Sequence, residues 1–313
     1  MKVIEHLSQA TEPLISFEIV PPTRGGNLEK LLTVVEQLQR FSPPFIDVTS
    51  HAAEATYEET PQGVQRRVSR KRPGTLGLCT IIQQKYKIDA VPHILCRGYT
   101  REETEDFLID AHYSGIQNVL ALRGDYCNYQ KIIQDDRSVN TYARDLVQQV
   151  AALNKGRYLH ELLDSLATNF CIGVAGYPEK HHEAPSPEAD IQHLKEKVDA
   201  GAEYIVTQMF FDNAHYFRFV ELCRNKGITV PIIPGLKVLT SQKQVQAIPK
   251  SFYIEMPSEL SKAVTSSPEH AKEIGVKWTT QQVQELLNRN VPAIHFYVMQ
   301  NSQPVLQVLQ NIV

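Results

Sequence analysis

A carboxylate inside an apolar run is the residue of this sequence whose surroundings most favour acid–base chemistry. Glu18 stands between Phe17 and Ile19 in residues 14–20, a run with the composition of a β-strand. Removal from water favours the neutral form of a carboxyl group. A carboxyl group that is neutral near the working pH can donate a proton in catalysis. The alternative is an ion pair between Glu18 and a neighbouring base, and the sequence leaves both open.

A second segment with chemical potential follows another apolar run, at residues 121–125. Gly124 lets the backbone approach a ligand closely. Arg123 can hold a phosphate through two parallel hydrogen bonds. Asp125 can accept a hydrogen bond from a ring N–H. This combination suits an anionic ligand that carries a nitrogen heterocycle.

Two histidine-containing segments come later in the chain. Residues 176–183 include adjacent histidines followed by a glutamate, but without the HExxH spacing of a zinc helix, so we expect no metal there. The next predicted helix places Asp190, His193 and Lys197 on one face. Read alone, that face is typical of a solvated surface. Nucleophilic catalysis has little support, because the sequence contains no GxSxG motif.

The elements that must position these residues alternate between strand-like and helix-like segments. The predicted strands are residues 14–20, 45–49, 90–96, 117–122, 170–175, 203–210, 230–234 and 293–298. The predicted helices are residues 27–41, 100–114, 188–200, 213–226 and 279–289. Eight such units predict a (β/α)8 TIM barrel, with residues 1–313 forming a single domain. An open doubly wound sheet is the alternative, although neither GxGxxG nor a Walker A motif occurs.

Two regions depart from this alternation. Residues 74–85 form either a ninth strand or, as we expect, a helical turn of the second connection. Residues around 249–277 are predicted to be a helical insertion before the last helix.

Polar side chains recur on one face of the predicted strands, towards their C-terminal ends. Period-2 alternation aligns Ser16 with Glu18, Asp47 with Thr49, Val91 with His93, Val119 and Ala121 with Arg123 and Asp125, Gly173 and Ala175 with Tyr177, Val206 with Gln208, and His295 with Tyr297. TIM-barrel active sites form at this end of the strands. Seven strands with the same pattern predict a polar ligand in the mouth of the barrel.

Composition excludes several classes of function. The net charge is −3, from 32 basic and 35 acidic residues, which argues against a nucleic-acid partner. The short basic run at residues 66–72 is predicted to be a solvated face. No apolar stretch is long enough to span a membrane, and the first ten residues do not resemble a signal peptide. We expect a cytoplasmic homo-oligomer.

The cysteines predict neither a disulfide framework nor a structural zinc site. Their number is odd, their spacing is wide and no CxxC motif occurs. They are Cys79, Cys96, Cys127, Cys171 and Cys223.

Nine short segments, in order between residues 14 and 300, resemble the methylenetetrahydrofolate reductase family. They are SFEIVPP at 16–22, VT at 48–49, PH at 92–93, ALRGD at 121–125, YPE and a histidine at 177–181, KVDAGA at 197–202, TQ and FFD at 207–212, IPG at 233–235, and HFY at 295–297. The resemblance implies a (β/α)8 flavoprotein with FAD. Such an enzyme reduces 5,10-methylenetetrahydrofolate to 5-methyltetrahydrofolate with NADH or NADPH, by ping-pong kinetics, and its product feeds methionine synthesis.

The resemblance also implies roles for individual residues. Glu18 matches the general acid that protonates N10 of the folate, and Asp125 matches a second catalytic residue that touches flavin and pterin. The substrate contacts are Asp125, Gln208 and Gln244, of which Gln244 matches a contact to the glutamate tail. The cofactor contacts are Thr49, Ser50, Ala52, His93, Arg123, Gly124, Asp125, Tyr142, Ala143, Ala175, Tyr177, His181, Asp190, His193 and Lys197, of which Thr49 matches a nicotinamide contact.

The chain also departs from the family pattern. An arginine that clamps the substrate glutamate normally follows the HFY segment by four residues, and Asn301 stands there. His193 and Glu196 replace Asn and Arg near the adenosine end of the FAD positions. We expect no regulatory domain. The alternatives are a pterin-dependent methyltransferase without flavin and a folate-binding protein without activity.

Overall fold

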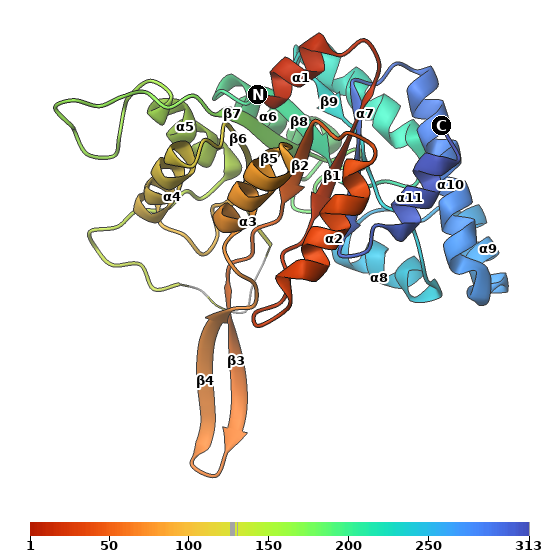
Figure 1. The fold of residues 1–313 in the computed structure, drawn as a ribbon, viewed down its shortest axis with the longest axis horizontal. Helices are drawn as coiled ribbons and strands as arrows, with labels where there is room; N and C mark the ends of the chain where they lie inside the picture. The colour runs from red at the N-terminus through yellow and green to blue at the C-terminus, as the bar shows by residue number, and fades with distance from the viewer. Residues whose placement is uncertain (126–128, 130, 313) are drawn as a thin grey trace.

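The computed structural model describes residues 1–125, 129 and 131–312, and a barrel of parallel strands lies at its centre (Figure 1). The strands are β1 Leu14–Ile19, β2 Phe45–Val48, β5 Asp89–Leu95, β6 Asn118–Leu122, β7 Cys171–Gly176, β8 Tyr204–Thr207, β9 Ile232–Ile233, β10 Gly235–Leu236 and β11 Ala293–Met299. The predicted seventh strand is divided at Pro234, which has no N–H to donate. β9 pairs with β8 and β10 with β11, so the divided strand closes the predicted barrel.

Helices cover the outside of this barrel. They include α2 Leu28–Gln39, α3 Thr75–Ile81 with the π-turn η1 Ile82–Tyr86, α4 Arg101–Tyr113, α5 Ala143–Leu153, α6 Pro187–Asp199, α7 Asn213–Asn225, α10 Ala271–Asn288 and α11 Gln303–Gln310. Local capping explains several starts: Asn27 accepts from the N–H of Glu29, and Thr100 forms a capping box with Glu103. Residues 74–85 are helical, as expected. In the described part of the chain, no helix has the length and apolarity to cross a membrane.

Helix α1, Val3–Gln9, lies at the N-terminal ends of the strands (Figure 1). Val3 belongs to the apolar cluster in the lumen that includes Phe45, Val91 and Tyr204. Its N–H donates to Asn118 Oδ1 at 2.8 Å, which ties α1 to β6. The lower lumen is therefore apolar and covered, so the polar inward residues lie towards the C-terminal ends of the strands.

The predicted inward faces are correct for most strands but wrong for β6. Leu120 packs in the lumen cluster, whereas Val119 and Ala121 pack with the outer core against the helices. The strand ends at Leu122 and Gly124 has φ +86°, so strand alternation cannot be extended to the residues that follow.

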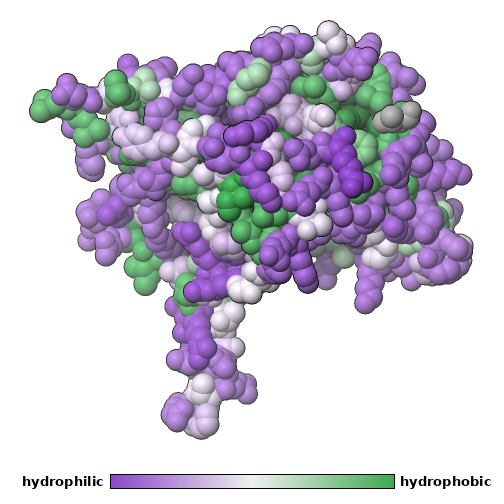
Figure 2. Space-filling view, viewed as in Figure 1, coloured by the Kyte–Doolittle hydropathy of each residue, from purple (hydrophilic) through white to green (hydrophobic). Residues whose placement is uncertain are grey.

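A long hairpin that was not predicted projects from the mouth of the barrel, opposite α1 (Figure 1). β3 Ala53–Thr60 and β4 Gly63–Arg70 pair antiparallel, joined by a two-residue turn. Its surface is largely hydrophilic (Figure 2), and Tyr57 and Val64 are more than half exposed. Pro61-Gln62-Gly63 was the available turn signal, but the flanking charges weaken the strand pattern.

The predicted insertion is present with different bounds. α8 Gln242–Phe252, α9 Ser258–Ser266 and the 3-10 turn Pro268–His270 precede α10, which begins at Ala271 instead of residue 279. Gly275 does not interrupt α10. Of the cysteines, Cys79, Cys96, Cys171 and Cys223 are free and buried, and Cys127 lies outside the described residues.

Gly275 lets α10 pack directly against the backbone that follows β10. A Cβ at Gly275 would overlap the carbonyl oxygen of Leu239 and lie 2.7 Å from its carbonyl carbon. We expect Gly275→Ala to destabilise the protein by about 1–3 kcal/mol through overpacking. The measurement is urea unfolding.

Gly77 provides the matched control, since it lies in α3 and a Cβ added there would meet no atom within 4 Å. Gly77→Ala should be neutral or stabilising by up to about 1 kcal/mol. Equal effects of the two substitutions would contradict the proposed close packing.

Candidate active site

Glu18 lies at the centre of a buried group of ionisable side chains in the barrel. β1 and β2 pair so that Glu18 is opposite Asp47, and His93 comes from the next strand, β5. His93 Nε2 lies 3.5 Å from Glu18 Oε2 and 3.4 Å from Asp47 Oδ2. Glu18 is 9% exposed, whereas Asp47 is fully buried. The carboxyl groups of Glu18 and Asp47 therefore both lie close to the same imidazole nitrogen of His93.

The surroundings favour the neutral form of Glu18. Burial raises the pKa of Glu18 to about 7; His93 opposes this shift, Asp47 adds to it and Lys237 opposes it. Burial by itself lowers the pKa of His93, but contact with Asp47 and the charge of Glu18 outweigh it and the net pKa is raised. The raised pKa of His93 and the raised pKa of Glu18 place the titration of both groups close to neutral pH.

Residues from β11 and the end of β10 complete this group. Ser16 Oγ and His295 Nδ1 lie 2.9 Å apart. Burial lowers the pKa of His295 to about 4, so its ring is neutral at neutral pH. Lys237 Nζ donates to the carbonyl of Tyr297 at 2.9 Å, and burial lowers the pKa of Lys237 to about 8. Lys237 was missed from the sequence; its position just after a short strand was the available signal.

A second cluster forms at the ends of β6 and β7 from residues predicted to bind the cofactor. The Arg123 guanidinium lies 5.1 Å from the centre of the Tyr142 ring. The rings of Tyr177 and His181 meet edge to face at 4.6 Å. Asp190 Oδ2 accepts from the N–H of His181 at 2.9 Å. The fold thus brings these five residues together from four places in the chain: the end of β6, the start of α5, the loop after β7 and helix α6.

Lys197 and Asp125 lie beside this cluster. Lys197 Nζ donates to the carbonyl of Ala175 at 2.6 Å, and burial lowers its pKa to about 8 against the opposing charge of Asp190. Asp125 is exposed, and its charge acts on the pKa of both His51 and Tyr177. Asp125 therefore lies at an exposed position from which its charge acts on residues of the connections after both β2 and β7.

Several polar atoms at the mouth are buried without a partner in the described part of the chain. They are Thr49 Oγ1, His51 Nδ1 and Arg123 Nε. Buried polar groups are normally hydrogen-bonded. Together with the aromatic rings and cations beside them, these atoms fit a polar, anionic and ring-containing cofactor. Ser50 and Ala52 follow Thr49 at the same rim, and Gly124 and Ala143 flank Arg123 and Tyr142 in the sequence.

Two predicted contacts are engaged elsewhere in this structure. The His193 side chain is 64% exposed on α6 and lies 3.8 Å from Glu196, which pairs with Arg144. Gln244 Oε1 accepts from the N–H of Thr240 at 2.7 Å and so caps its own loop. The match to the family predicted the helix or loop that carries His193 and Gln244, but it could not predict which neighbours their side chains would contact.

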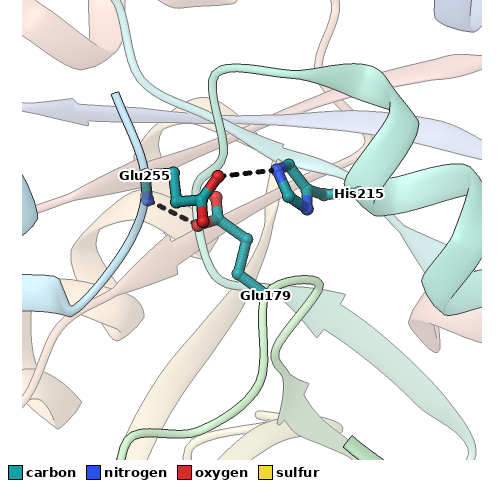
Figure 3. Close-up of side chains that lie close together, drawn as sticks. All are labelled: Glu179, His215 and Glu255. Atoms are coloured by element: carbon teal, nitrogen blue, oxygen red, sulfur yellow. Dashed lines mark hydrogen bonds and ion pairs between the residues drawn. The ribbon is translucent and has the colours of Figure 1, made fainter. Parts of the chain in front are cut away.

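Gln208 lies in a small cavity beside Tyr177, Met209 and Glu179. Glu179 in turn converges with His215 and Glu255 (Figure 3). The N–H of Glu255 donates to Glu179 Oε2, and His215 Nε2 lies 3.5 Å from Glu255 Oε2. These contacts tie the α8–α9 connection to the loop after β7, next to the mouth.

Fold and site define a class of protein: a TIM barrel with a buried acid at its mouth beside a cluster suited to an anionic cofactor. The family model for methylenetetrahydrofolate reductase matches residues 2–313. The chain belongs to this family.

Curated relatives agree with this assignment. The chain is 31% identical over 292 residues to a 5,10-methylenetetrahydrofolate reductase of Pectobacterium carotovorum, covering 92% of this chain and 86% of the relative. It is 30% identical over 327 residues to a probable methylenetetrahydrofolate reductase (NADH) of Oryza sativa, covering 100% of this chain and 50% of the relative. The chain thus spans about half of the plant protein.

A solved structure supports the fold independently. A protein of Clostridium thermocellum, described as binding two copies of 5-methyl-5,6,7,8-tetrahydrofolic acid, superimposes with a TM-score of 0.62 at 13% identity. The alignment covers 99% of this chain and 98% of that one. At this identity the likeness concerns the barrel alone.

The charge of Lys237 is predicted to contribute to the pKa of Glu18 by lowering it. Lys237→Met removes a cation that lowers this pKa, so the pKa should rise above about 7 and the carboxyl group should stay protonated to higher pH. Infrared absorption of the protonated carboxyl, assigned by its loss in Glu18→Gln, measures the shift. Lys243→Met, on an exposed position of α8, is the control. A lowered or unchanged pKa in Lys237→Met would refute this electrostatic coupling.

Proposed function

We propose that this chain reduces 5,10-methylenetetrahydrofolate to 5-methyltetrahydrofolate, with FAD as its cofactor and NADH or NADPH as the reductant. The observation that carries the proposal is Glu18, a 9% exposed carboxyl group whose pKa is raised to about 7 at the mouth of the barrel. Family membership supplies the substrate. A cytoplasmic location, a homo-oligomeric state and use of the product in methionine synthesis belong to the same proposal.

Glu18 acts as the general acid. The methylene carbon of the substrate bridges N5 and N10, and protonation of N10 by Glu18 lets that ring open towards an N5 iminium ion. A group with a pKa near neutrality is protonated in a large fraction of molecules and still releases its proton readily. Once ionised, Glu18 is stabilised by His93 and Lys237, whose charges favour the carboxylate.

The bound flavin would supply the hydride chemistry, accepting hydride from the nicotinamide and passing it to the one-carbon unit. Arg123 and Lys197 are the cations that would face its pyrophosphate; in this structure Arg123 pairs with Glu183, so the phosphate would have to compete with that carboxylate. Thr49 and Gln208 lie on either side of the mouth. They would contact the nicotinamide nucleotide in one half-reaction and the folate in the other. Because both substrates use one opening, we propose that they bind in turn.

An anaerobic titration of the purified holoprotein tests this function. The protein should carry a flavin absorption spectrum that NADH or NADPH bleaches and 5,10-methylenetetrahydrofolate restores. A colourless protein that takes up no FAD on reconstitution would refute the proposal. A folate protein that lacks flavin chemistry, such as a methyltransferase, would show no bleaching.

Glu18→Gln should separate the two half-reactions. The amide retains the size of the side chain but cannot donate the catalytic proton, so flavin reduction by the nicotinamide should be kept. Reduction of the folate should fall by a factor of about 10² to 10⁴, the usual contribution of a general acid. Stopped-flow absorbance of the flavin measures both steps. Normal folate turnover in this variant would show that Glu18 is not the acid.

A further inference from the structure

The β3–β4 hairpin is fixed to the rim of the barrel mouth at its base. The N–H of Arg24 donates to the carbonyl of Lys71 at 2.7 Å. Ala52 packs so closely on Gly98, at the end of β5, that a Cβ there would lie 2.7 Å from the Ala52 Cβ. An isolated hairpin is only marginally stable, so contacts with the barrel are needed to hold it. The contacts at its base fix how the hairpin joins the rim. The hairpin therefore extends the rim of the proposed active site.

The basic residues of the hairpin fall into two groups. On one face, Arg67 pairs with Glu58 at 3.2 Å, and at the base Lys71 pairs with Glu54. The register places the side chains of Arg66 and Arg70 on the opposite face. In the described residues, neither of these two guanidinium groups nor that of Arg72 lies within ion-pair distance of a carboxylate.

Aromatic side chains of neighbouring loops hold two of these arginines. Arg70 lies 5.1 Å from the ring centre of Tyr99, which follows β5. Arg66 lies 5.3 Å from that of Tyr129, which follows β6. Cation–π contacts orient a guanidinium without neutralising its charge. This face of the hairpin therefore meets the loops of the mouth with both guanidinium groups outside ion pairs, and the charge of Arg70 also acts on Glu103, where it helps to lower the pKa of that carboxyl group.

Arg72 brings a third cation to the point where β1 and β11 end. Arg72 Nη1 donates to the carbonyl of Pro21, and Gln300 Nε2 donates to the same carbonyl at 3.2 Å. Gln300 is adjacent to Asn301, which stands in place of the arginine expected after the HFY segment. Position 301 carries no charge in this chain, and the base of the hairpin places a guanidinium group on the carbonyl that its neighbour Gln300 also contacts.

We propose that Arg66, Arg70 and Arg72 bind the carboxylates of a γ-linked polyglutamate tail on the folate substrate. The inference rests on the proposed function and deepens it. Arg72 at the rim meets the first glutamate, and Arg70 and Arg66 meet those beyond it. The Cα atoms of Arg66 and Arg70 are about 13 Å apart along the strand, so one carboxylate cannot serve both. Each guanidinium can hold a carboxylate through two hydrogen bonds.

The test compares folates that differ only in tail length. For the holoprotein, KM for 5,10-methylenetetrahydrofolate should be lower for the pentaglutamate than for the monoglutamate. Arg66→Gln/Arg70→Gln should raise KM for the pentaglutamate roughly three- to tenfold and leave the monoglutamate unaffected. Arg72→Gln should raise KM for both. The KM for the nicotinamide nucleotide should not change in any variant.

Arg67→Gln is the matched control, because it removes a neighbouring charge from the opposite face of the same strand. An equal loss in Arg67→Gln, or a wild-type KM independent of tail length, would overturn the proposal. A rise in KM for the nicotinamide alone would assign the arginines to nucleotide phosphate and overturn it as well.

Equilibrium binding of 5-methyltetrahydrofolate monoglutamate and pentaglutamate to the same proteins distinguishes failure of this inference from failure of the proposed reductase function. A protein that binds the pentaglutamate more tightly through these arginines but reduces no folate would refute the proposed function alone. A protein that reduces folate without any dependence on tail length would refute only the role of the hairpin.

Discussion

The arrangement of the site depends on the removal of one carboxyl group from water. Glu18 is 9% exposed and meets a histidine that also faces the fully buried Asp47. Two carboxylates this close cannot both ionise without cost, and His93 compensates only one of them. Burial and the neighbouring carboxylate therefore raise the pKa of Glu18 to about 7, against the opposing charge of His93. The general-acid role proposed for Glu18 depends on this packing.

The layered interior of the barrel maintains that state. Below Glu18 the lumen is filled by apolar side chains such as Phe45, Val91 and Tyr204, and α1 covers the end. The ionisable groups around Glu18 lie above this apolar layer, where burial lowers the pKa of His295 to about 4 and that of Lys237 to about 8. A low-dielectric floor strengthens each of these interactions. Because this apolar layer fills the lumen below Glu18, a ligand can reach Glu18 only from the mouth of the barrel.

The mouth itself divides between two chemistries. The ends of β6 and β7 gather the aromatic rings and cations proposed to bind the flavin nucleotide. The side formed by β11, β1 and β2 carries Glu18 and the point where the hairpin joins the barrel. Arg123 contributes to the first and Arg72 to the second. Arg123 is held by the Tyr142 ring and by an ion pair with Glu183, and Arg72 is held by the carbonyl of Pro21.

The sequence by itself determined the barrel and the identity of its central acid. The alternation of strands and helices, the caps at Asn27 and Thr100, and the inward direction of Glu18 all follow from interactions between residues close in the chain. The exceptions have local causes as well: Pro234 divides a strand, and the chain leaves the β6 alternation after Leu122. These features were predictable because periodicity and capping act over a few residues.

Only the tertiary structure decided which groups surround the acid. The approach of Asp47, His93 and Lys237 to Glu18 depends on strand order and register, which join residues far apart in the sequence. The orientations of His193 and Gln244 depend on their packing partners. The hairpin was not predicted because its exposed strands have no buried face that would impose an alternating pattern of apolar residues. Its attachment depends on long-range contacts at its base, between Arg24 and Lys71 and between Gly98 and Ala52. Register and long-range packing are properties of the folded chain, and no short pattern records them.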